Sequence, residues 1–267
     1  MKILICKLRT IIFRLGCFFK FKLLLLSGKH LQFKSNQEAL FAQHGFDRDK
    51  ALTRLNVACE KVLSKPFNES DGMMSEHLVL FAAISLQKEV HSILEIGTFD
   101  GRSAAIISEL FPNAKITTID LAQSDSDFEK SYARNNKVEQ FIQKRKSFLS
   151  WSKNIKFVEK NSLLLTNNTS KEFDLIWIDG AHGYPVVAID LLNAYKLAKK
   201  DGYILIDDIW VNSVKSDPMY CSVGGYQTLE AMKNSTLIKN YYLFKKRIDA
   251  RYNVKGFNQK YVGFIKL

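Results

Sequence analysis

A series of short apolar runs, separated by segments long enough for helices, constrains the fold of this chain more than any other feature. Each run has the length of a strand and closes on Glu, Asp or Gly ahead of a loop. Strands that alternate with helices predict an α/β fold with a parallel sheet covered by helices on both faces. Ligands of such sheets bind outside the carboxyl ends of the strands. The runs are SILEIGT (92–98), KITTID (115–120), IKFVEK (155–160), FDLIWIDG (173–180) and GYILIDD (202–208).

The first run leads into a glycine-rich turn, EIGTFDG over residues 95–101, and the segment 102–110 is predicted to be a helix. Gly97 and Gly101 let the backbone turn tightly and pass close to a ligand, toward which the helix would direct its free amides. The glycine spacing differs from the G-x-G-x-x-G pattern that cradles a dinucleotide pyrophosphate. The turn therefore indicates a nucleotide-like ligand and argues against NAD or FAD.

The second run ends in Asp120, the next carboxylate expected at this edge of the sheet. A carboxylate at this place can accept hydrogen bonds from both hydroxyls of a ribose. Asp120 could instead cap the following helix, as aspartate often does. Because it occurs together with the glycine loop, we favour the ribose interpretation.

Acidic residues also close the fourth and fifth runs, Asp179 in one and Asp207-Asp208 in the other. If these strands are neighbours, about 4.8 Å separates their backbones, and the carboxylates converge. Left bare, they would repel one another and raise each other's pKa values. A hard divalent cation with oxygen ligands, Mg²⁺ or Mn²⁺, would relieve this repulsion and could lower the pKa of a substrate hydroxyl. We therefore expect a divalent metal on Asp179, Asp207 and Asp208.

His182 follows Asp179 by three residues and completes the predicted catalytic cluster. An imidazole there could take the proton of a substrate hydroxyl, because it is largely neutral near pH 7. The alternative is a structural histidine that holds the loop in place. We favour the general base, with Asp179 as its catalytic neighbour.

The E-x-G-x-x-x-G turn followed by ITTID resembles the first two motifs of class I S-adenosylmethionine-dependent methyltransferases. The resemblance implies a doubly wound, mostly parallel seven-stranded sheet and S-adenosylmethionine as cofactor. It also implies that Gly97 and Gly101 flank the methionine part of the cofactor, that Glu95 organises this pocket, and that Asp120 holds the ribose. Asn161 and Ser162, after the third run, would then lie near the adenine.

The stretch 173–210, with IDGAHGY and the closing LIDD, resembles a subfamily that includes the macrocin and mycinamicin sugar O-methyltransferases. The resemblance implies methyl transfer to a hydroxyl of a sugar or small polyol, as in glycan modification. It makes Asp179, Asp207 and Asp208 metal ligands and His182 the base. It further implies that the runs near 241–244 and 261–266 form an antiparallel hairpin at the edge of the sheet.

Composition divides the chain into a basic apolar leader (1–37), a helical segment (38–90) and the proposed methyltransferase domain (91–267). The leader holds eight Lys or Arg and no acid, out of a net charge of +12 for the chain. Cations interrupt its apolar stretches, so it is neither a membrane span nor a signal peptide. Attachment to an anionic membrane surface and packing on the body or on a second subunit both remain open.

Two other functions are compatible with parts of the sequence. A nucleic-acid methyltransferase would explain the positive charge, but that charge lies in the leader, and no N-P-P-Y-like motif follows the fourth run. A noncatalytic, membrane-associated protein that binds the cofactor would not need the complete set of polar site residues. The four cysteines form no C-x-x-C pair, which favours a cytoplasmic protein, peripheral on the inner face of the membrane if the leader binds lipid. The acceptor and a homo-oligomeric state stay open.

Overall fold

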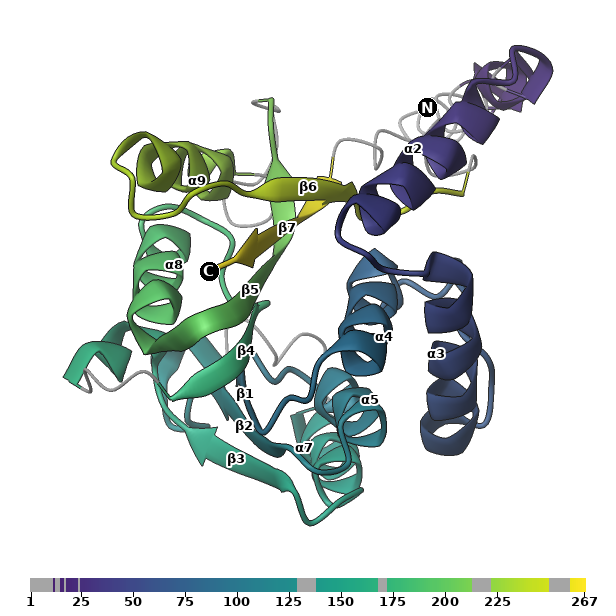
Figure 1. Cartoon of the computed structure of the whole chain (residues 1–267). Helices are drawn as coiled ribbons and strands as arrows, with labels where there is room; N and C mark the ends of the chain where they lie inside the picture. Colours follow the sequence, from purple (N-terminus) through teal and green to yellow (C-terminus); the bar gives the residue numbers. More distant parts are fainter. Residues whose placement is uncertain are drawn as a thin grey trace, which may run out of the picture.

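A mixed seven-stranded sheet of order β3-β2-β1-β4-β5-β7-β6 forms the centre of the computed structural model (Figure 1). Strands β1 to β5 are parallel, and β7 runs antiparallel to both β5 and β6. This confirms the predicted fold class, including the antiparallel hairpin. The strands are β1 (Ser92–Ile96), β2 (Lys115–Asp120), β3 (Ile155–Glu159), β4 (Phe173–Ile178), β5 (Ala198–Trp210), β6 (Tyr242–Lys245) and β7 (Lys260–Lys266).

The structure describes residues 12, 15–16, 18–23, 25–128, 138–167, 172–212, 222–249 and 260–267, without the side chains of residues 29–30 and 166–167. Parts of the leader lie outside the described residues.

Helices cover both faces of the sheet, and each face has its own hydrophobic core (Figure 1). The central parallel strands are buried on both sides, which is why they read as continuous apolar runs. Trp177 of β4, for example, is fully buried. One face carries α3 (Arg48–Leu63), α4 (Glu76–Gln87), α5 (Arg102–Leu110) and α7 (Val138–Leu149), and the other carries the short helix η1 (Ser162–Asn167), α8 (Val186–Leu197) and α9 (Gly224–Asn234).

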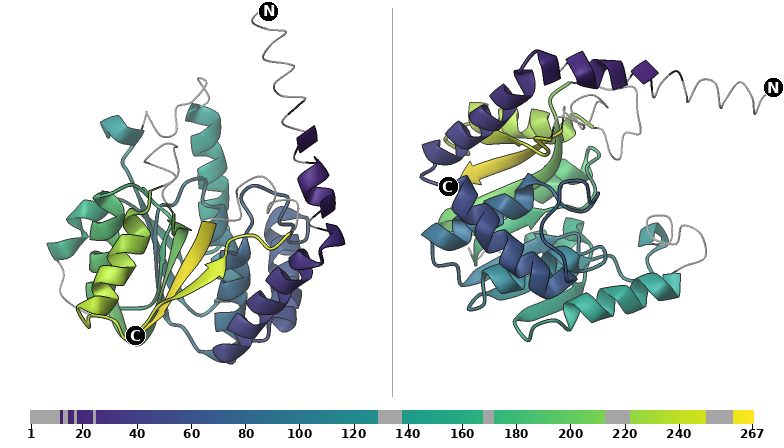
Figure 2. Two further views of the ribbon diagram at one scale, coloured as in Figure 1. Left: turned by 90° about the horizontal axis from the view of Figure 1, so that it is seen from above. Right: turned by 90° about the vertical axis from the view of Figure 1, so that its right-hand side faces the viewer.

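Helix α2 (Lys29–Gln43) leads from the leader to the body and runs across residue 37, where the composition changes. It is joined to the body by Gln37, whose amide donates to Glu76 Oε2 and to the carbonyl of Lys245, both at 3.1 Å. The described leader residues before it are helical and project away from the sheet (Figure 2). No helix in the described part of the chain is long and apolar enough to cross a membrane.

Candidate active site

The glycine loop crosses closely over the end of β4. Gly97 has φ of +99°, and a side chain there would overlap the backbone carbonyl of Asp179. The two segments are also joined by the Asp179 amide, which donates to the carbonyl of Ile96 at 2.8 Å. Gly101, at φ of +81°, precedes the first turn of α5 and faces Leu149 of α7. The glycines that the sequence assigned to ligand approach therefore also allow the close crossing of the chain.

Glu95 lies in β1, fully buried beneath this loop. Its Oε2 accepts a hydrogen bond of 2.6 Å from the hydroxyl of Thr118, whereas Oε1 has no hydrogen-bond partner among the described residues. Burial raises the pKa of the Glu95 carboxyl to about 8, and the charges of Asp120 and Asp100 add to the shift. A buried carboxyl with one unused oxygen can receive a cationic group, such as the amino group of a methionine moiety.

Asp120 closes β2 beside the glycine loop, and its carboxylate is nearly buried. Its Oδ2 accepts from the amide of Phe99 at 2.8 Å, and its Oδ1 accepts from the amide of Leu121 at 2.8 Å. Arg145 of α7 adds an ion pair, with 3.2 Å between Nη2 and Oδ2. Arg145 also donates through Nε to the carbonyl of Phe99 at 2.5 Å. Asp120 is thus oriented by the glycine loop itself, and Arg145 is a neighbour that no sequence motif indicated.

The turn after β3 holds the two residues assigned to the adenine. The Lys160 amide donates to the carbonyl of Asp120 at 2.8 Å, which places this turn next to the end of β2. Asn161 accepts from the amide of Leu163 at 3.0 Å, and the carbonyl of Ser162 accepts from Asn193 at 3.0 Å. Both residues lie at the edge of the glycine-loop site, and their contact with adenine stays a prediction.

The three predicted acids lie at the ends of β4 and β5, which are neighbours as expected. Adjacent residues of a regular strand point to opposite faces. In β5, however, the register shifts between Ile206 and Ile209, and Asp208 has φ of +52°. This irregularity lets the carboxylates of Asp207 and Asp208 contact the same neighbour, Lys246.

Two lysines from the edge hairpin meet these aspartates. Lys246, just after β6, donates through Nζ to Asp207 and to Asp208, with 2.5 Å to Oδ1 of Asp208. Lys260, at the start of β7, donates through Nζ to the other oxygen of Asp208. Neither lysine was identified from the sequence. The only sequence signal is the basic run Lys245-Lys246-Arg247 directly after a strand.

The charges divide the three acids into two kinds. Burial and the negative charge of Asp207 raise the pKa of Asp179 well above its ordinary value. Burial opposes ionisation of Asp207 too, but the ammonium of Lys246 outweighs it and holds the pKa of Asp207 below its ordinary value. The same pairing raises the pKa of Lys246 despite its burial. Asp179 therefore stays protonated more readily than Asp207.

His182 lies against Asp179, with 3.6 Å between Nε2 and Oδ1, and is only 8% exposed. Its Nδ1 is buried without a hydrogen-bond partner among the described residues. Burial lowers the pKa of the His182 imidazole, so the ring is neutral near pH 7. A second buried histidine, His77 of α4, stacks on Trp177 at 4.8 Å between ring centroids. Burial lowers the pKa of His77 to about 4.

The residues described here do not fit the predicted divalent metal. The described part of the chain contains no group of three His, Cys, Asp or Glu side chains arranged to hold a metal ion. Lys246 instead contacts Oδ2 of Asp207 and Oδ1 of Asp208, and Lys260 contacts Oδ2 of Asp208, while Oδ1 of Asp207 has no hydrogen-bond partner among the described residues. The assignment of Asp179, Asp207 and Asp208 as metal ligands stays a prediction from the sequence, which the arrangement of the described residues does not support.

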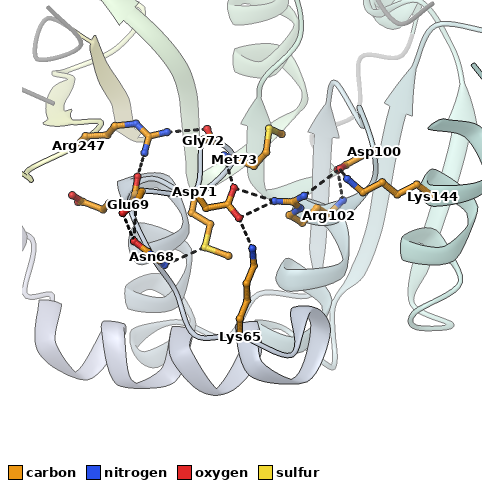
Figure 3. A network of polar contacts seen from close by, with 12 residues as sticks. Lys65, Asn68, Glu69, Asp71, Gly72, Met73, Asp100, Arg102, Lys144 and Arg247 are labelled. Atoms are coloured by element: carbon orange, nitrogen blue, oxygen red, sulfur yellow. Dashed lines mark hydrogen bonds and ion pairs between the residues drawn. The ribbon is translucent and has the colours of Figure 1, made fainter. Parts of the chain in front are cut away.

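The loop between α3 and α4 contacts both the start of α5, next to the glycine loop, and the segment after β6 (Figure 3). Asp71 of this loop pairs with Arg102 at the start of α5, with 3.4 Å between Oδ1 and Nη1. On the other side, Arg247 donates to the carbonyls of Glu69 and Gly72, at 2.8 Å for Gly72. The loop thus connects the glycine-loop side with the segment that carries Lys246.

The sheet order, the glycine loop and the carboxylate after β2 together define the class of S-adenosylmethionine-dependent methyltransferases. Residues 94–209, less than half of the chain, match the family model described as a methyltransferase domain. The expected enzyme class is confirmed. No curated protein matches the sequence.

Solved structures show the same fold at low sequence identity. A putative caffeoyl-CoA O-methyltransferase from Staphylococcus aureus matches with a TM-score of 0.50 and 18% identity, over 87% of this chain and 99% of that chain. The MycE methyltransferase of the mycinamycin biosynthetic pathway, in complex with Mg and SAH, matches with a TM-score of 0.51 and 15% identity, over 80% of this chain and 54% of that chain. An O-methyltransferase family protein from Burkholderia thailandensis matches with a TM-score of 0.44 and 12% identity, over 70% of this chain and 55% of that chain. The chain thus spans about half the length of the last two.

Proposed function

We propose that this protein transfers the methyl group of S-adenosylmethionine to a hydroxyl oxygen of a sugar or small polyol. The observation that carries the proposal is the buried His182–Asp179 pair at the end of β4. It lies directly beside the glycine loop, because the Asp179 backbone is the closest neighbour of Gly97. A neutral imidazole next to the cofactor pocket suits removal of a hydroxyl proton during transfer.

The chemistry assigned to these residues is a single displacement. The acceptor oxygen forms a bond to the methyl carbon as the carbon–sulfur bond breaks, and its electron pair stays on sulfur. The hydroxyl proton goes to His182. Glu95 and Asp120 hold the cofactor, and the fixed geometry supplies the alignment of oxygen, methyl and sulfur.

One likeness supports oxygen as the acceptor atom, because the Staphylococcus aureus protein is described as a putative caffeoyl-CoA O-methyltransferase. The choice of a sugar or small polyol rests on the IDGAHGY and LIDD motifs of the sequence. The test is incubation of the full chain with S-adenosylmethionine and a panel of sugars and polyols, with mass spectrometry of both products. Methylation of an amine or a nucleic acid in place of any hydroxyl would contradict the proposal.

Asp120→Ala is expected to weaken binding of S-adenosylmethionine and its demethylated product by about tenfold or more. Loss of hydrogen bonds to a charged acceptor costs about 1.5 to 3 kcal/mol, and each 1.4 kcal/mol is a factor of ten in affinity. The change also leaves Arg145 without its ion pair. Isothermal titration calorimetry with the demethylated cofactor measures the effect.

Glu159→Ala is the matched control, because Glu159 is an exposed carboxylate in the strand register position opposite Asp120. The Glu159→Ala variant should bind the demethylated cofactor with the affinity of the wild type. Asp120→Asn separates charge from hydrogen bonding, since an amide keeps one acceptor oxygen. Unchanged affinity in Asp120→Ala would remove this carboxylate from the ribose site.

We further propose that the leader, residues 1–37, attaches the protein to an anionic membrane surface, on the inner face of the cytoplasmic membrane. The described side chains of this segment support an interfacial helix, because Phe19 is 64% exposed and Leu26 83% exposed. Lys20 and Lys22 lie among them. Apolar side chains can enter the headgroup region while lysines bind anionic lipids, each contributing about 1 kcal/mol.

Removal of residues 1–28, which leaves α2 and the contacts of Gln37 in place, should abolish flotation with vesicles that contain anionic lipid, while binding of S-adenosylmethionine stays intact. Lys20→Glu with Lys22→Glu should weaken flotation, and Lys200→Glu, an exposed lysine of the body, should not. Flotation should fall as salt rises, since screening shortens the reach of the charges. A full-length chain that ignores anionic vesicles at low salt would identify the leader as a packing element.

A further inference from the structure

Two lysines pair with Asp207 and Asp208 near the end of β5, and the sequence analysis did not predict these ion pairs. Lys246 and Lys260 have side chains only 15% and 17% exposed, and their partners Asp207 and Asp208 are 5% and 8% exposed. Two lysine side chains thus pair with two aspartate side chains at a largely buried position. Such charges are retained inside a protein only when they are paired, as they are here.

Lys246 is held in place by the backbone on both sides. Its amide donates to the carbonyl of Lys260 at 3.0 Å, and its carbonyl accepts from the amide of Glu76 at 3.0 Å. The next residue, Arg247, is bound to the loop between α3 and α4 (Figure 3). The ammonium therefore sits at a defined point between the carboxylates instead of at the end of a free surface chain.

A divalent cation and this ammonium cannot share the same oxygens. A metal bound to Asp207 and Asp208 would lie within a few ångströms of Nζ, and the two like charges would repel strongly in a buried site. The lysines already balance the charge of the two aspartates. A metal that bound these same oxygens could enter only after Lys246 had been displaced from them.

We propose that Lys246, assisted by Lys260, supplies the fixed positive charge of this site in place of a divalent metal, and that Lys246 contacts the acceptor oxygen. An ammonium has three N–H donors. Among the described residues, Lys246 Nζ donates to Asp207 and Asp208, which leaves a donor for the acceptor. This inference rests on the proposed function for the identity of the acceptor.

In the transfer step Lys246 keeps its charge throughout. As the acceptor O–H bond breaks and the O–CH₃ bond forms, the proton goes to His182 and the electron pair of the broken C–S bond goes to sulfur. The N–H of Lys246 stabilises the partial negative charge that develops on the acceptor oxygen. No metal and no further reactant enters the balance.

Manganese binding tests the inference without any methyl acceptor. We expect the full chain to show no saturable binding of Mn²⁺ by electron paramagnetic resonance or calorimetry. Lys246→Ala should gain one Mn²⁺ site, because it frees carboxylate oxygens of Asp207 and Asp208. Adding Asp207→Asn should remove that site again. Lys199→Ala is the control, since it removes another lysine that is paired with an aspartate, Asp174, and should bind no Mn²⁺.

Activity provides the second readout. Wild-type turnover should be unchanged in excess chelator, and Lys246→Ala should fall on the order of tenfold, because Lys260 still neutralises part of the charge. Lys246→Met, which keeps the apolar stem, serves if the alanine variant does not fold. Saturable Mn²⁺ binding by the wild type that Asp207→Asn abolishes, or loss of activity in chelator, would overturn the inference. Failure to find a methylated hydroxyl would instead contradict the proposed function. The Mn²⁺ measurement would still decide whether Lys246 takes the place of a metal.

Discussion

His182→Ala should lower the rate of methyl transfer by roughly a hundredfold or more, while binding of S-adenosylmethionine stays at the wild-type value. Loss of a general base typically costs a factor of about 100 to 10,000. The imidazole is suited to the role because burial lowers its pKa, which keeps the unprotonated base available below pH 6.5. Its Nε2 lies 3.6 Å from Asp179 Oδ1, so the ring is next to a carboxyl group whose pKa is raised by burial and by the charge of Asp207.

The pH profile separates a base from a structural histidine. The wild-type rate should decline only as pH falls through the lowered pKa of His182, because protonation removes the acceptor for the hydroxyl proton. In His182→Ala this acid limb should disappear. His91→Ala, an exposed histidine before β1, is the control and should match the wild type. A His182 variant that keeps the full rate across neutral pH would leave alignment of the reactants as the main source of catalysis.

Most of the sheet could be predicted from the sequence because strand signals are local. Apolar runs of strand length, each followed by a polar turn, need no knowledge of distant residues. The same holds for Asp179 and His182, which lie three residues apart on one loop. Strand β5 was predicted too short, over 202–208, because polar residues (199–201) precede this run and the residues after Asp208, Ile209 and Trp210, pair only with β7.

The positive charges of the site could not be predicted in this way. Lys246 and Lys260 reach Asp207 and Asp208 only because the edge hairpin folds β7 back between β5 and β6. The aspartates in the sequence therefore suggested a metal site, because nothing in the sequence pattern indicated that Lys246 and Lys260 would neutralise them. Arg145 was missed for the same reason, because α7 brings it to Asp120 from a distant segment. Ion pairs between distant residues depend on topology, which strand patterns alone do not give.

Gly97→Ala should destabilise the whole domain and remove cofactor binding. A methyl group at this position would overlap the carbonyl of Asp179, and φ of +99° is a conformation that L side chains rarely adopt. The obstacle is backbone, which cannot move without separating β1 from β4. Backbone strain of about 1 to 3 kcal/mol and overpacking of about 1 to 3 kcal/mol together give a loss on the order of 2 to 6 kcal/mol.

Thermal unfolding measures this loss as a fall in midpoint on the order of 10 °C. Gly180→Ala is a matched control, because Gly180 lies on the other side of the same crossing and a side chain there would meet only ordinary contacts, the nearest at 3.6 Å. It should unfold near the wild-type temperature. The comparison distinguishes two roles of Gly97. If Gly97→Ala kept the wild-type midpoint and lost only S-adenosylmethionine binding, the glycine would serve the ligand and not the crossing. A loss of both, with Gly180→Ala unaffected, would establish that one glycine joins the cofactor loop to the strand that carries Asp179 and His182.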